Sequence, residues 1–435
     1  MPMLTLTLSL FLAATPSSEE VLHNWHQWRG PLATGAAPAA DPPLKWDAQT
    51  NIKWKTPIPG KGSATPIVWG DRIFILTAVG TKRPAAGSDL PKIDARFERK
   101  TQSPGTYHQF IVLCIDRQTG KVRWRQVATE QVPHEGHHPT HSYAAASPTT
   151  DGKYLYVSFG SRGLYCYDLD GHLQWQRDLG KMITRLGWGE GISPVIHGDT
   201  LVMNWDQEAD SFLIALDAHT GKTRWKAARD EPTSWATPLV LEHNGRTQVI
   251  VNATKRVRSY DLATGQLLWQ CGGQTVNVIP SPVADDKVVY CVSGYRGSFA
   301  CAISLDATGE LTDGRKLLWE YKQNTPYVPS PLLTGDRLYF TKGNSAVLTC
   351  LDTKTGKPLY ESERIPGLRS LYASPICAGG RIYITGRDGT TVVLKRSDQL
   401  EVLATNPLDD PIDASPVAVG KSLLLRAERY LYCIE

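Results

Sequence analysis

The sequence carries little net charge, and it lacks the motifs of the common enzyme classes. Its 47 Lys and Arg residues nearly balance 43 Asp and Glu, which leaves a net charge of +4. A balance this even gives no reason to expect a nucleic-acid partner. No P-loop, dinucleotide-binding fingerprint or Ser-His-Asp arrangement can be placed on the chain. Any function therefore has to be sought in the fold.

Long apolar runs are also missing, apart from a short one near the N-terminus. Residues 4–14, LTLTLSLFLAA, are followed by the polar segment TPSSEE. This run has the length of a signal-peptide core and is too short to span a bilayer, although no Lys or Arg precedes it. We expect residues 1–17 to be a signal peptide, and the protein to be exported to the periplasm or cell envelope.

The eight cysteines would ordinarily suggest disulfides in an exported protein. Four of them instead occupy one repeat position, two residues before the acidic residue that ends a strand: Cys114, Cys166, Cys350 and Cys433. Other repeats have Ala or Ser there, so we expect Cys to act as a small apolar filler. Cys291 and Cys301 flank the turn at 294–297, and a disulfide across that hairpin is the alternative.

A Ser-Pro or Thr-Pro pair opens a short apolar strand eight times along the chain. The pairs are Thr65-Pro66, Ser147-Pro148, Ser193-Pro194, Thr237-Pro238, Ser281-Pro282, Ser330-Pro331, Ser374-Pro375 and Ser415-Pro416. From the second pair on, the prolines lie 46, 44, 44, 49, 44 and 41 residues apart. A period of this size, built from short strands, is typical of the blades of a β-propeller.

Each repeat contains four short strands separated by Gly, Asp or Asn turns, as an antiparallel blade requires. In the third repeat the outer strand contains Trp225, and the other repeats have an aromatic residue at the same place: Trp124, Trp175, Trp269, Trp319 and Tyr360. The seventh repeat has Leu403 instead. We expect each Trp to wedge against the neighbouring blade.

The last repeat lacks its outer strand, because the chain stops at Glu435. Residues 51–58 contain Trp54 and precede the first blade, so they can supply the missing strand. The sequence therefore predicts an all-β, eight-bladed propeller of four-stranded antiparallel blades, closed by strand 51–58 in blade 8. Residues 18–50 form an N-terminal extension, and residues 51–435 form one propeller domain.

The turns of residues 116–124, 217–225 and 261–269 share the pattern Asp-x-x-Thr-Gly followed by Trp, with looser copies at 168–175 and 352–360. This pattern resembles the repeat of pyrroloquinoline-quinone (PQQ) β-propellers. The segment Trp25-His-Gln-Trp28-Arg-Gly-Pro31 is similar to the opening of PQQ-binding-like propeller proteins of bacteria. The resemblance covers nearly the whole mature chain. It implies either a protein-binding propeller like BamB, the outer-membrane assembly lipoprotein, or a quinoprotein dehydrogenase.

The quinoprotein reading implies PQQ and calcium as cofactors, and oxidation of alcohols or sugars. Asp413 or Glu190 would then act as the base, Asn277 would help to hold calcium, and Trp188 or Trp235 would stack on the quinone. The adjacent Cys-Cys pair of quinoprotein alcohol dehydrogenases and a haem-attachment Cys-x-x-Cys-His are both absent. The acylated Cys of the assembly lipoprotein is absent as well.

The loops before the first strands and the turns between the second and third strands should meet on one face of the ring. They supply the expected ligand-binding residues around a central funnel: Arg162, Trp188, Trp235, Asn277, Arg296, Tyr327 and Arg387. A cation recurs in most of these turns, including Arg256, Lys342 and Arg426. A ring of positive charge would concentrate an anion such as PQQ; exposed turn residues without a ligand are the alternative.

Two clusters suggest metal ligands. The first comprises His134, His137, His138 and His141, whose imidazoles could bind zinc or copper; an ordered loop without metal is the alternative. The second comprises Asp206, Glu208 and Asp210, which could hold calcium, although the Gly and distal Glu of an EF-hand are missing.

Residues 79–108 form a long insertion in blade 1, and they are either a partner-binding arm or disordered. Taken together, the sequence favours a non-catalytic binding or scaffold protein whose funnel recognises a protein segment, a glycan or a small anion. We expect a monomer with a protein or glycan partner and no nucleic acid, and leave peripheral membrane association open. A PQQ- and calcium-dependent oxidoreductase is the alternative.

Overall fold

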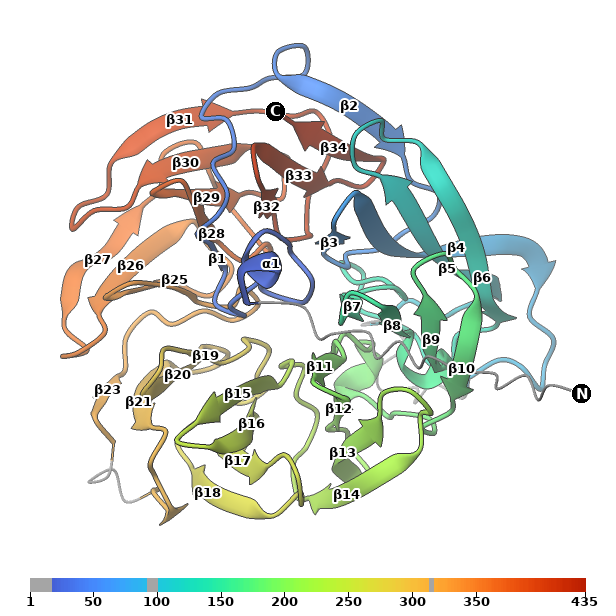
Figure 1. Cartoon of the computed structure of the whole chain (residues 1–435), viewed down its shortest axis with the longest axis horizontal. Coiled ribbons are helices and arrows are strands. Elements are labelled where there is room, and N and C mark those ends of the chain that lie inside the picture. Colours follow the sequence, from blue (N-terminus) through green and yellow to red (C-terminus); the bar gives the residue numbers. More distant parts are fainter. Residues whose placement is uncertain (1–17, 92–100, 313–316) are drawn as a thin grey trace, which may run out of the picture.

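Short apolar runs between Gly and Asp turns form eight sheets arranged in a ring (Figure 1). The structure, a computed structural model, describes residues 18–91, 101–312 and 317–435. Each sheet contains four antiparallel strands from the centre outward, and two of the sheets have a fifth strand paired in parallel at one edge. The predicted eight-bladed propeller of four-stranded antiparallel blades is therefore confirmed. The signal peptide predicted at 1–17 lies outside the described residues.

The first four blades, each given from its inner to its outer strand, are as follows: β3 (Ile67–Trp69), β4 (Arg72–Pro84), β5 (Thr106–Asp116) and β6 (Val122–Gln131); β7 (Thr149–Thr150), β8 (Tyr154–Ser158), β9 (Leu164–Asp168) and β10 (Leu173–Arg177); β11 (Val195–His197), β12 (Thr200–Trp205), β13 (Ser211–Asp217) and β14 (Thr223–Arg229); β15 (Leu239–His243), β16 (Arg246–Asn252), β17 (Val257–Asp261) and β18 (Leu267–Cys271).

The last four blades follow the same order: β19 (Val283–Ala284), β20 (Val288–Ser293), β21 (Phe299–Ser304) and β23 (Trp319–Tyr321); β24 (Leu332–Thr334), β25 (Arg337–Thr341), β26 (Val347–Asp352) and β27 (Pro358–Arg364); β28 (Ile376–Ala378), β29 (Arg381–Thr385), β30 (Thr391–Lys395) and β31 (Val402–Asn406); β32 (Val417–Val419), β33 (Ser422–Arg426), β34 (Tyr430–Ile434) and β2 (Ile52–Pro57).

Beyond the blades lie α1 (Ser18–Leu22), the 3-10 turns η1 (Gly160–Arg162) and η2 (Arg185–Gly187), and two short strands that pair in parallel at sheet edges, β1 (Ala36–Ala37) on β28 and β22 (Gly309–Glu310) on β18. No helix within the described ranges is long and apolar enough to cross a membrane.

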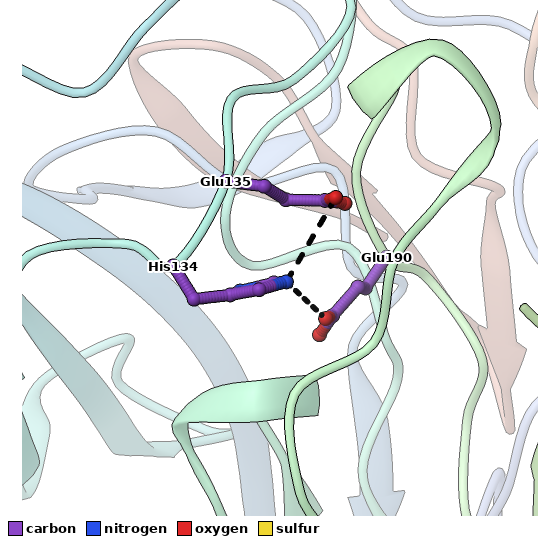
Figure 2. Close-up of side chains that lie close together, drawn as sticks. All are labelled: His134, Glu135 and Glu190. Carbon is purple, nitrogen blue, oxygen red and sulfur yellow. Dashed lines mark ion pairs between the residues drawn. The ribbon is translucent and has the colours of Figure 1, made fainter. Parts of the chain in front are cut away.

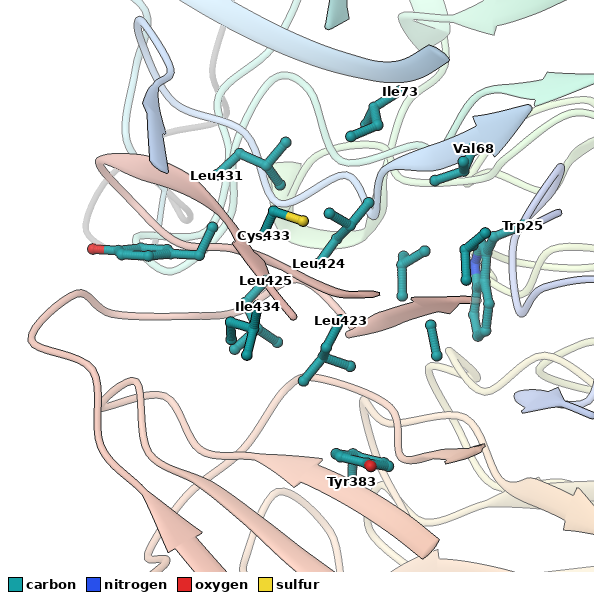
Figure 3. Close-up of a cluster of buried hydrophobic side chains, with 14 of the residues drawn as sticks. Trp25, Val68, Ile73, Tyr383, Leu423, Leu424, Leu425, Leu431, Cys433 and Ile434 are labelled. Carbon is teal, nitrogen blue, oxygen red and sulfur yellow. The ribbon is translucent and has the colours of Figure 1, made fainter. Parts of the chain in front are cut away.

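The ring closes as predicted, because β2 pairs antiparallel with β34 and completes blade 8. Trp54 lies opposite Cys433 in this pairing. Figure 3 shows the hydrophobic cluster at this junction, where Leu424 and Ile434 of blade 8 lie near Val68 and Ile73 of blade 1. Closure brings the first strand of the propeller domain, β2, and its last strand, β34, into one sheet, so β34 has a partner on its outer edge.

An indole docked on a turn glycine connects neighbouring blades. Trp175 Nε1 donates to the carbonyl of Ala218 (2.8 Å) in the next blade, and a Cβ on Gly221 of that turn would lie 2.8 Å from Cε3 of the indole. The same contact recurs at Trp54, Trp124, Trp225 and Trp319. The predicted wedging role of these tryptophans is therefore confirmed.

Trp269 is the exception. Its indole donates to Gln248 Oε1 (3.2 Å) within blade 4 rather than to a carbonyl of blade 5. In blade 5 the connection between β21 and β23 is long, and its strand β22 pairs with β18, with Gly309 opposite Trp269. The extra strand therefore covers the position where the turn of the next blade would otherwise dock.

The N-terminal extension crosses the middle of the ring, as the blue segment with α1 and β1 in Figure 1 shows. Its backbone pairs with blade 1 through Trp25 and Val68, and with blade 7 through β1. Arg29 is 1% exposed, and its guanidinium donates to the carbonyls of Pro331 (2.8 Å) and Pro375 (2.9 Å) in two Ser-Pro pairs. Burial lowers the pKa of Arg29 to about 9. The extension thus plugs one end of the central channel.

The described residues of the insertion at 79–108 extend two strands of blade 1. Its first residues lengthen β4 and its last lengthen β5, with Val79 opposite Gln109 and Pro84 opposite Thr106. Residues 92–100 lie outside the described residues. On the return, Gln102 and His137 exchange two backbone hydrogen bonds (2.8 and 3.2 Å). The insertion therefore braces a loop beside the centre of the ring.

All eight cysteines are buried free thiols, which confirms the predicted role of Cys114, Cys166, Cys350 and Cys433 as small core residues. The alternative disulfide between Cys291 and Cys301 is wrong, although these residues lie directly opposite each other in β20 and β21. Both thiols pack inside an apolar cluster, and burial raises their pKa well above the ordinary value.

The indole docking can be tested with two glycines of blade 3 that both have left-handed backbones, Gly221 (φ 68°) and Gly198 (φ 55°). A Cβ on Gly198 would meet nothing within 4 Å, so Gly198→Ala should cost only the backbone strain of about 1–2 kcal/mol. Gly221→Ala should cost about 1–3 kcal/mol more, because its Cβ collides with Trp175. Denaturant unfolding of both variants measures the difference, and equal losses would contradict the docking.

The state of the cysteines gives a second prediction. Because all eight thiols are buried, a thiol reagent should react with none of them in the folded protein. In guanidinium chloride without reductant, the same reagent should count eight. A count of six in denaturant would show that a disulfide exists and that the assignment of free thiols is wrong.

Candidate functional site

The eight Ser-Pro and Thr-Pro pairs form a ring of hydroxyl groups around the central axis. Ser193 Oγ accepts the backbone N–H of Ser147 in the preceding blade (2.9 Å), and Thr237 Oγ1 accepts that of Ser193 (3.1 Å). The chain of contacts continues through blades 5 to 8 and ends where Thr65 Oγ1 accepts the N–H of Ser415 (3.1 Å). Seven of the eight blade junctions are therefore joined by this contact.

The ring is open at the junction of blades 1 and 2. Ser147 Oγ is buried and has no hydrogen-bond partner within the described ranges. At this junction, hydrogen bonds from residues just before the two pairs connect blades 1 and 2. The N–H of Ser63 donates to Ser142 Oγ (3.1 Å), and the N–H of Ala64 donates to the Ala144 carbonyl (3.1 Å). A buried polar atom without a partner costs free energy, so Ser147 Oγ is a ready contact for a ligand or water.

All eight hydroxyl-bearing residues line one central cavity of about 450 Å³. Trp28 of the N-terminal extension also lines it, and its Nε1 donates to Ser281 Oγ (2.9 Å). Since the extension closes one end of the channel, the cavity is a funnel with a polar floor. Its volume is in the range of small-molecule binding sites.

Aromatic side chains line the funnel: Trp188, Trp235, Tyr295, Tyr327 and Tyr372. Tyr295 and Tyr327 are stacked, with centroids 4.5 Å apart, and Trp235 Nε1 donates to the carbonyl of Gly189 (2.7 Å). Trp188 Nε1 is buried without a partner within the described ranges. Burial raises the pKa of Tyr327 to about 12, so this side chain stays a neutral hydroxyl at physiological pH.

The funnel has little net charge. Among the described residues, Asp413 is the one carboxylate in its lining. Arg387 donates to both of its oxygens (2.7 and 3.1 Å) and lies over the ring of Tyr372. Burial lowers the pKa of His141 to about 4 and, together with Arg387, lowers that of His138. Both imidazoles are therefore neutral at pH 7.

The Arg side chains predicted to surround the funnel do not line it; each has other neighbours. Arg256 lies 3.7 Å from Asp230, and Arg296 lies over the ring of Tyr295. Arg162 lines a separate small cavity beside Glu190. Arg426 is 2% exposed, and its Nε and Nη1 donate to the carbonyls of Gly62 (2.8 Å) and Leu76 (2.9 Å). The recurring cation therefore does not produce a ring of positive charge in the funnel.

PQQ and calcium need groups that the described residues of the funnel lining do not offer. PQQ carries three carboxylates, yet no Lys or Arg of the described residues lines the funnel. Calcium prefers several oxygen ligands, but Asp413 is engaged by Arg387 and Glu190 faces His134 and Ser161 outside the funnel. Asn277 is 1% exposed and outside the lining. The residues present do not fit this pair of cofactors.

The four histidines suggested as metal ligands do not converge on one point. His137 Nδ1 lies 2.7 Å from the His138 carbonyl, His138 Nδ1 lies 2.8 Å from Thr140 Oγ1, and His141 Nε2 lies 2.9 Å from the Glu190 carbonyl. Only His134 belongs to a group of potential metal ligands within the described ranges, together with Glu135 and Glu190.

Figure 2 shows this group, in which His134 Nε2 lies 3.1 Å from Glu190 Oε1 and 3.9 Å from Glu135 Oε2. Burial raises the pKa of both carboxyl groups to about 7, and the charge of Glu190 raises the pKa of Glu135 further. Burial also lowers the pKa of His134. Arg162, which lines the same cavity, offsets part of the pKa rise at Glu190.

The acidic set Asp206, Glu208 and Asp210 is split between the interior and the surface. Asp206 forms a fully buried ion pair with Arg229, with contacts of 2.7 and 3.0 Å. Glu208 is exposed and accepts two hydrogen bonds from Thr233 (3.1 and 2.8 Å), and Asp210 is exposed as well. These carboxylates face different partners.

Sequence reasoning missed Glu135, Trp28 and the hydroxyl groups of the repeat itself as parts of the site. Glu135 follows His134 in the sequence, so the dense polar composition of that loop was the available signal. The hydroxyls were visible as a repeat, but their common orientation toward one cavity depends on closure of the ring.

Comparison with known proteins gives one family and several similar structures. The family model of the outer membrane protein assembly factor BamB (PQQ_2) matches residues 108–362. No curated protein matches the chain significantly. BamB from Moraxella catarrhalis has a similar structure with 14% identity and a TM-score of 0.55, over 83% of this chain and 99% of that one.

Two further structures show the same fold at low identity. Quinohemoprotein alcohol dehydrogenase from Comamonas testosteroni has 10% identity and a TM-score of 0.64, over 94% of this chain and 80% of that one. The computationally designed Ika8 protein has 12% identity and a TM-score of 0.53, over 82% and 98%. An assembly factor, an enzyme and a designed protein share the architecture, so these likenesses show the fold alone. Because the family match spans more than half of the sequence, the chain belongs to the PQQ_2 family of the outer membrane protein assembly factor BamB.

Proposed function

We propose that this protein is a non-catalytic binding protein whose central funnel takes an uncharged segment of a glycan. The observation that carries the proposal is a funnel with little net charge, lined by five aromatic side chains and by a ring of eight hydroxyl groups. Sugar rings have the matching chemistry, since they offer apolar C–H faces and many hydroxyl groups.

The floor supports this choice through its hydrogen-bonding capacity. In seven of the blades the Ser or Thr oxygen already accepts a backbone N–H, and no hydrogen bond donated by these hydroxyls is found within the described residues. A hydroxyl that accepts one bond can still donate its own hydrogen. Donors grouped on a floor suit a ligand that is rich in oxygen acceptors, as a glycan is.

The walls support the same ligand class. The flat faces of Trp and Tyr bury apolar area at low cost in conformational entropy, while their polar ends stay available for hydrogen bonds. A trianionic ligand is disfavoured, because no Lys or Arg of the described residues lines the funnel and Arg387 is paired with Asp413. The predicted export to the periplasm or cell envelope, which rests on residues 4–14 and on the description of the family, would place the protein among glycans.

Titration of the purified protein with neutral oligosaccharides of glucose, N-acetylglucosamine and xylose tests the proposal. We expect calorimetry to detect binding of at least one of them, and Trp188→Ala and Tyr327→Ala to weaken it by about tenfold or more, about 1.4 kcal/mol. Tyr154→Ala, which removes an aromatic residue outside the funnel, should leave the affinity unchanged. No binding by the whole panel, or binding indifferent to both funnel variants, would contradict the proposal and favour a protein segment as ligand.

A second titration addresses the quinoprotein alternative. PQQ added with Ca²⁺ should leave the quinone absorbance unchanged, and dye reduction with alcohols or aldoses should stay at background. The physical reason is that no Lys or Arg of the described residues lines the funnel, and that Arg387, which contacts the lining carboxylate Asp413, is already paired with it. Stoichiometric binding with turnover would overturn the non-catalytic assignment.

A further inference from the structure

The group His134, Glu135 and Glu190 lies behind the funnel wall rather than in the funnel. His134 and Glu135 come from the loop between β6 and β7, and Glu190 from the loop between η2 and β11 (Figure 2). One ligand atom from each residue lies within 4.8 Å of the others. Their side chains are 10%, 15% and 14% exposed, so three polar groups meet in a largely buried place.

Each carboxylate is held in position by one neighbouring residue that donates twice. Ser161 donates its backbone N–H (2.7 Å) and its hydroxyl to the two oxygens of Glu190. Thr184 donates its N–H (3.1 Å) and hydroxyl (2.5 Å) to the two oxygens of Glu135. Donors that orient carboxylates in this way are typical of the outer shell of metal sites, where they fix the ligands before the ion arrives.

Charge and space both favour a small cation at this place. Two carboxylates close together in a low-dielectric environment repel each other, and a nearby cation removes that cost. All three residues line a cavity of about 40 Å³, which exceeds the room that one water molecule needs. The carbonyl of Met182 also points at the site, 2.6 Å from His134 Nε2.

We propose that His134, Glu135 and Glu190 bind a divalent transition-metal ion, with Zn²⁺ as the ion best suited to one imidazole and two carboxylates. Calcium is less suited, since it prefers ligand sets made of oxygen alone. The Met182 carbonyl or a water molecule in the small cavity can complete four ligands. His134 Nε2 must give up its proton to bind the ion, because a metal ligand needs the nitrogen lone pair.

The site is connected to the funnel through the loop that carries Glu190. The N–H of His138 donates to the Trp188 carbonyl (3.1 Å), and the Trp235 indole donates to the Gly189 carbonyl (2.7 Å). The Glu190 carbonyl contacts His141 Nε2 (2.9 Å). An ion on Glu190 would therefore fix the loop that supplies one wall of the funnel.

Calorimetric titration of tag-free, EDTA-dialysed protein with zinc chloride tests the proposal, and it measures the metal alone, independently of any glycan. We expect one equivalent of zinc to bind and to raise the thermal midpoint of unfolding. Glu190→Gln and Glu135→Gln should each weaken zinc binding by at least about tenfold, the lower end of what disturbing a ligand shell costs. Asp210→Asn, which changes an exposed carboxylate elsewhere, is the matched control and should bind zinc as the wild type does.

Circular dichroism would establish that each variant is folded before its titration is interpreted, and His134→Asn provides a third ligand variant. The proposal is wrong if zinc does not bind stoichiometrically after EDTA treatment. It is equally wrong if folded Glu190→Gln and Glu135→Gln retain wild-type affinity, or if the protein binds calcium chloride in place of zinc.

Discussion

The docking of an outer-strand indole on the turn of the next blade is the contact on which the rest of this structure depends. The turn fits because its Asp caps it, as when Asp217 Oδ1 accepts the N–H and hydroxyl of Thr220, and because Gly221 has no Cβ where the indole lies. Each such contact joins the sheets of two neighbouring blades. Repeated around the ring, it sets the spacing of the blades and hence the width of the channel.

The width of the channel decides what the inner strands can do. At seven junctions the hydroxyl of one Ser-Pro or Thr-Pro pair meets the backbone N–H of the previous pair, which is possible only when neighbouring blades are held at a constant distance. The N-terminal extension then closes one end, with Arg29 bound to the carbonyls of Pro331 and Pro375 and Trp28 bound to Ser281. The extension therefore converts an open channel into a funnel that is closed at one end. The proposed ligand site lies in this funnel.

The loops around the open end of the funnel differ from the blades, because they contain buried ionisable groups and a strained backbone residue. They contain buried groups with altered pKa values, such as Glu135 and Glu190, and a left-handed non-glycine residue, Leu186 (φ 58°). Strain and buried charge of this kind persist only where the surrounding structure holds them, and they concentrate at functional sites. The insertion in blade 1 contributes to this support, because the Thr101 hydroxyl donates to the Leu186 carbonyl (2.7 Å).

The sequence by itself determined the number of blades, the closure by Trp54 and the packing role of the tryptophans and cysteines. These properties follow from local patterns, namely a strand period, a turn motif and a missing strand. Only the tertiary structure decided which side chains face the funnel and which charges are paired. Arg426 and Arg387 both occupy blade turns, yet one is buried against carbonyls and the other pairs with Asp413, and Glu190 faces His134 rather than the funnel. Side-chain direction and charge compensation depend on neighbours from other blades, far away in the sequence, and no local pattern specifies them.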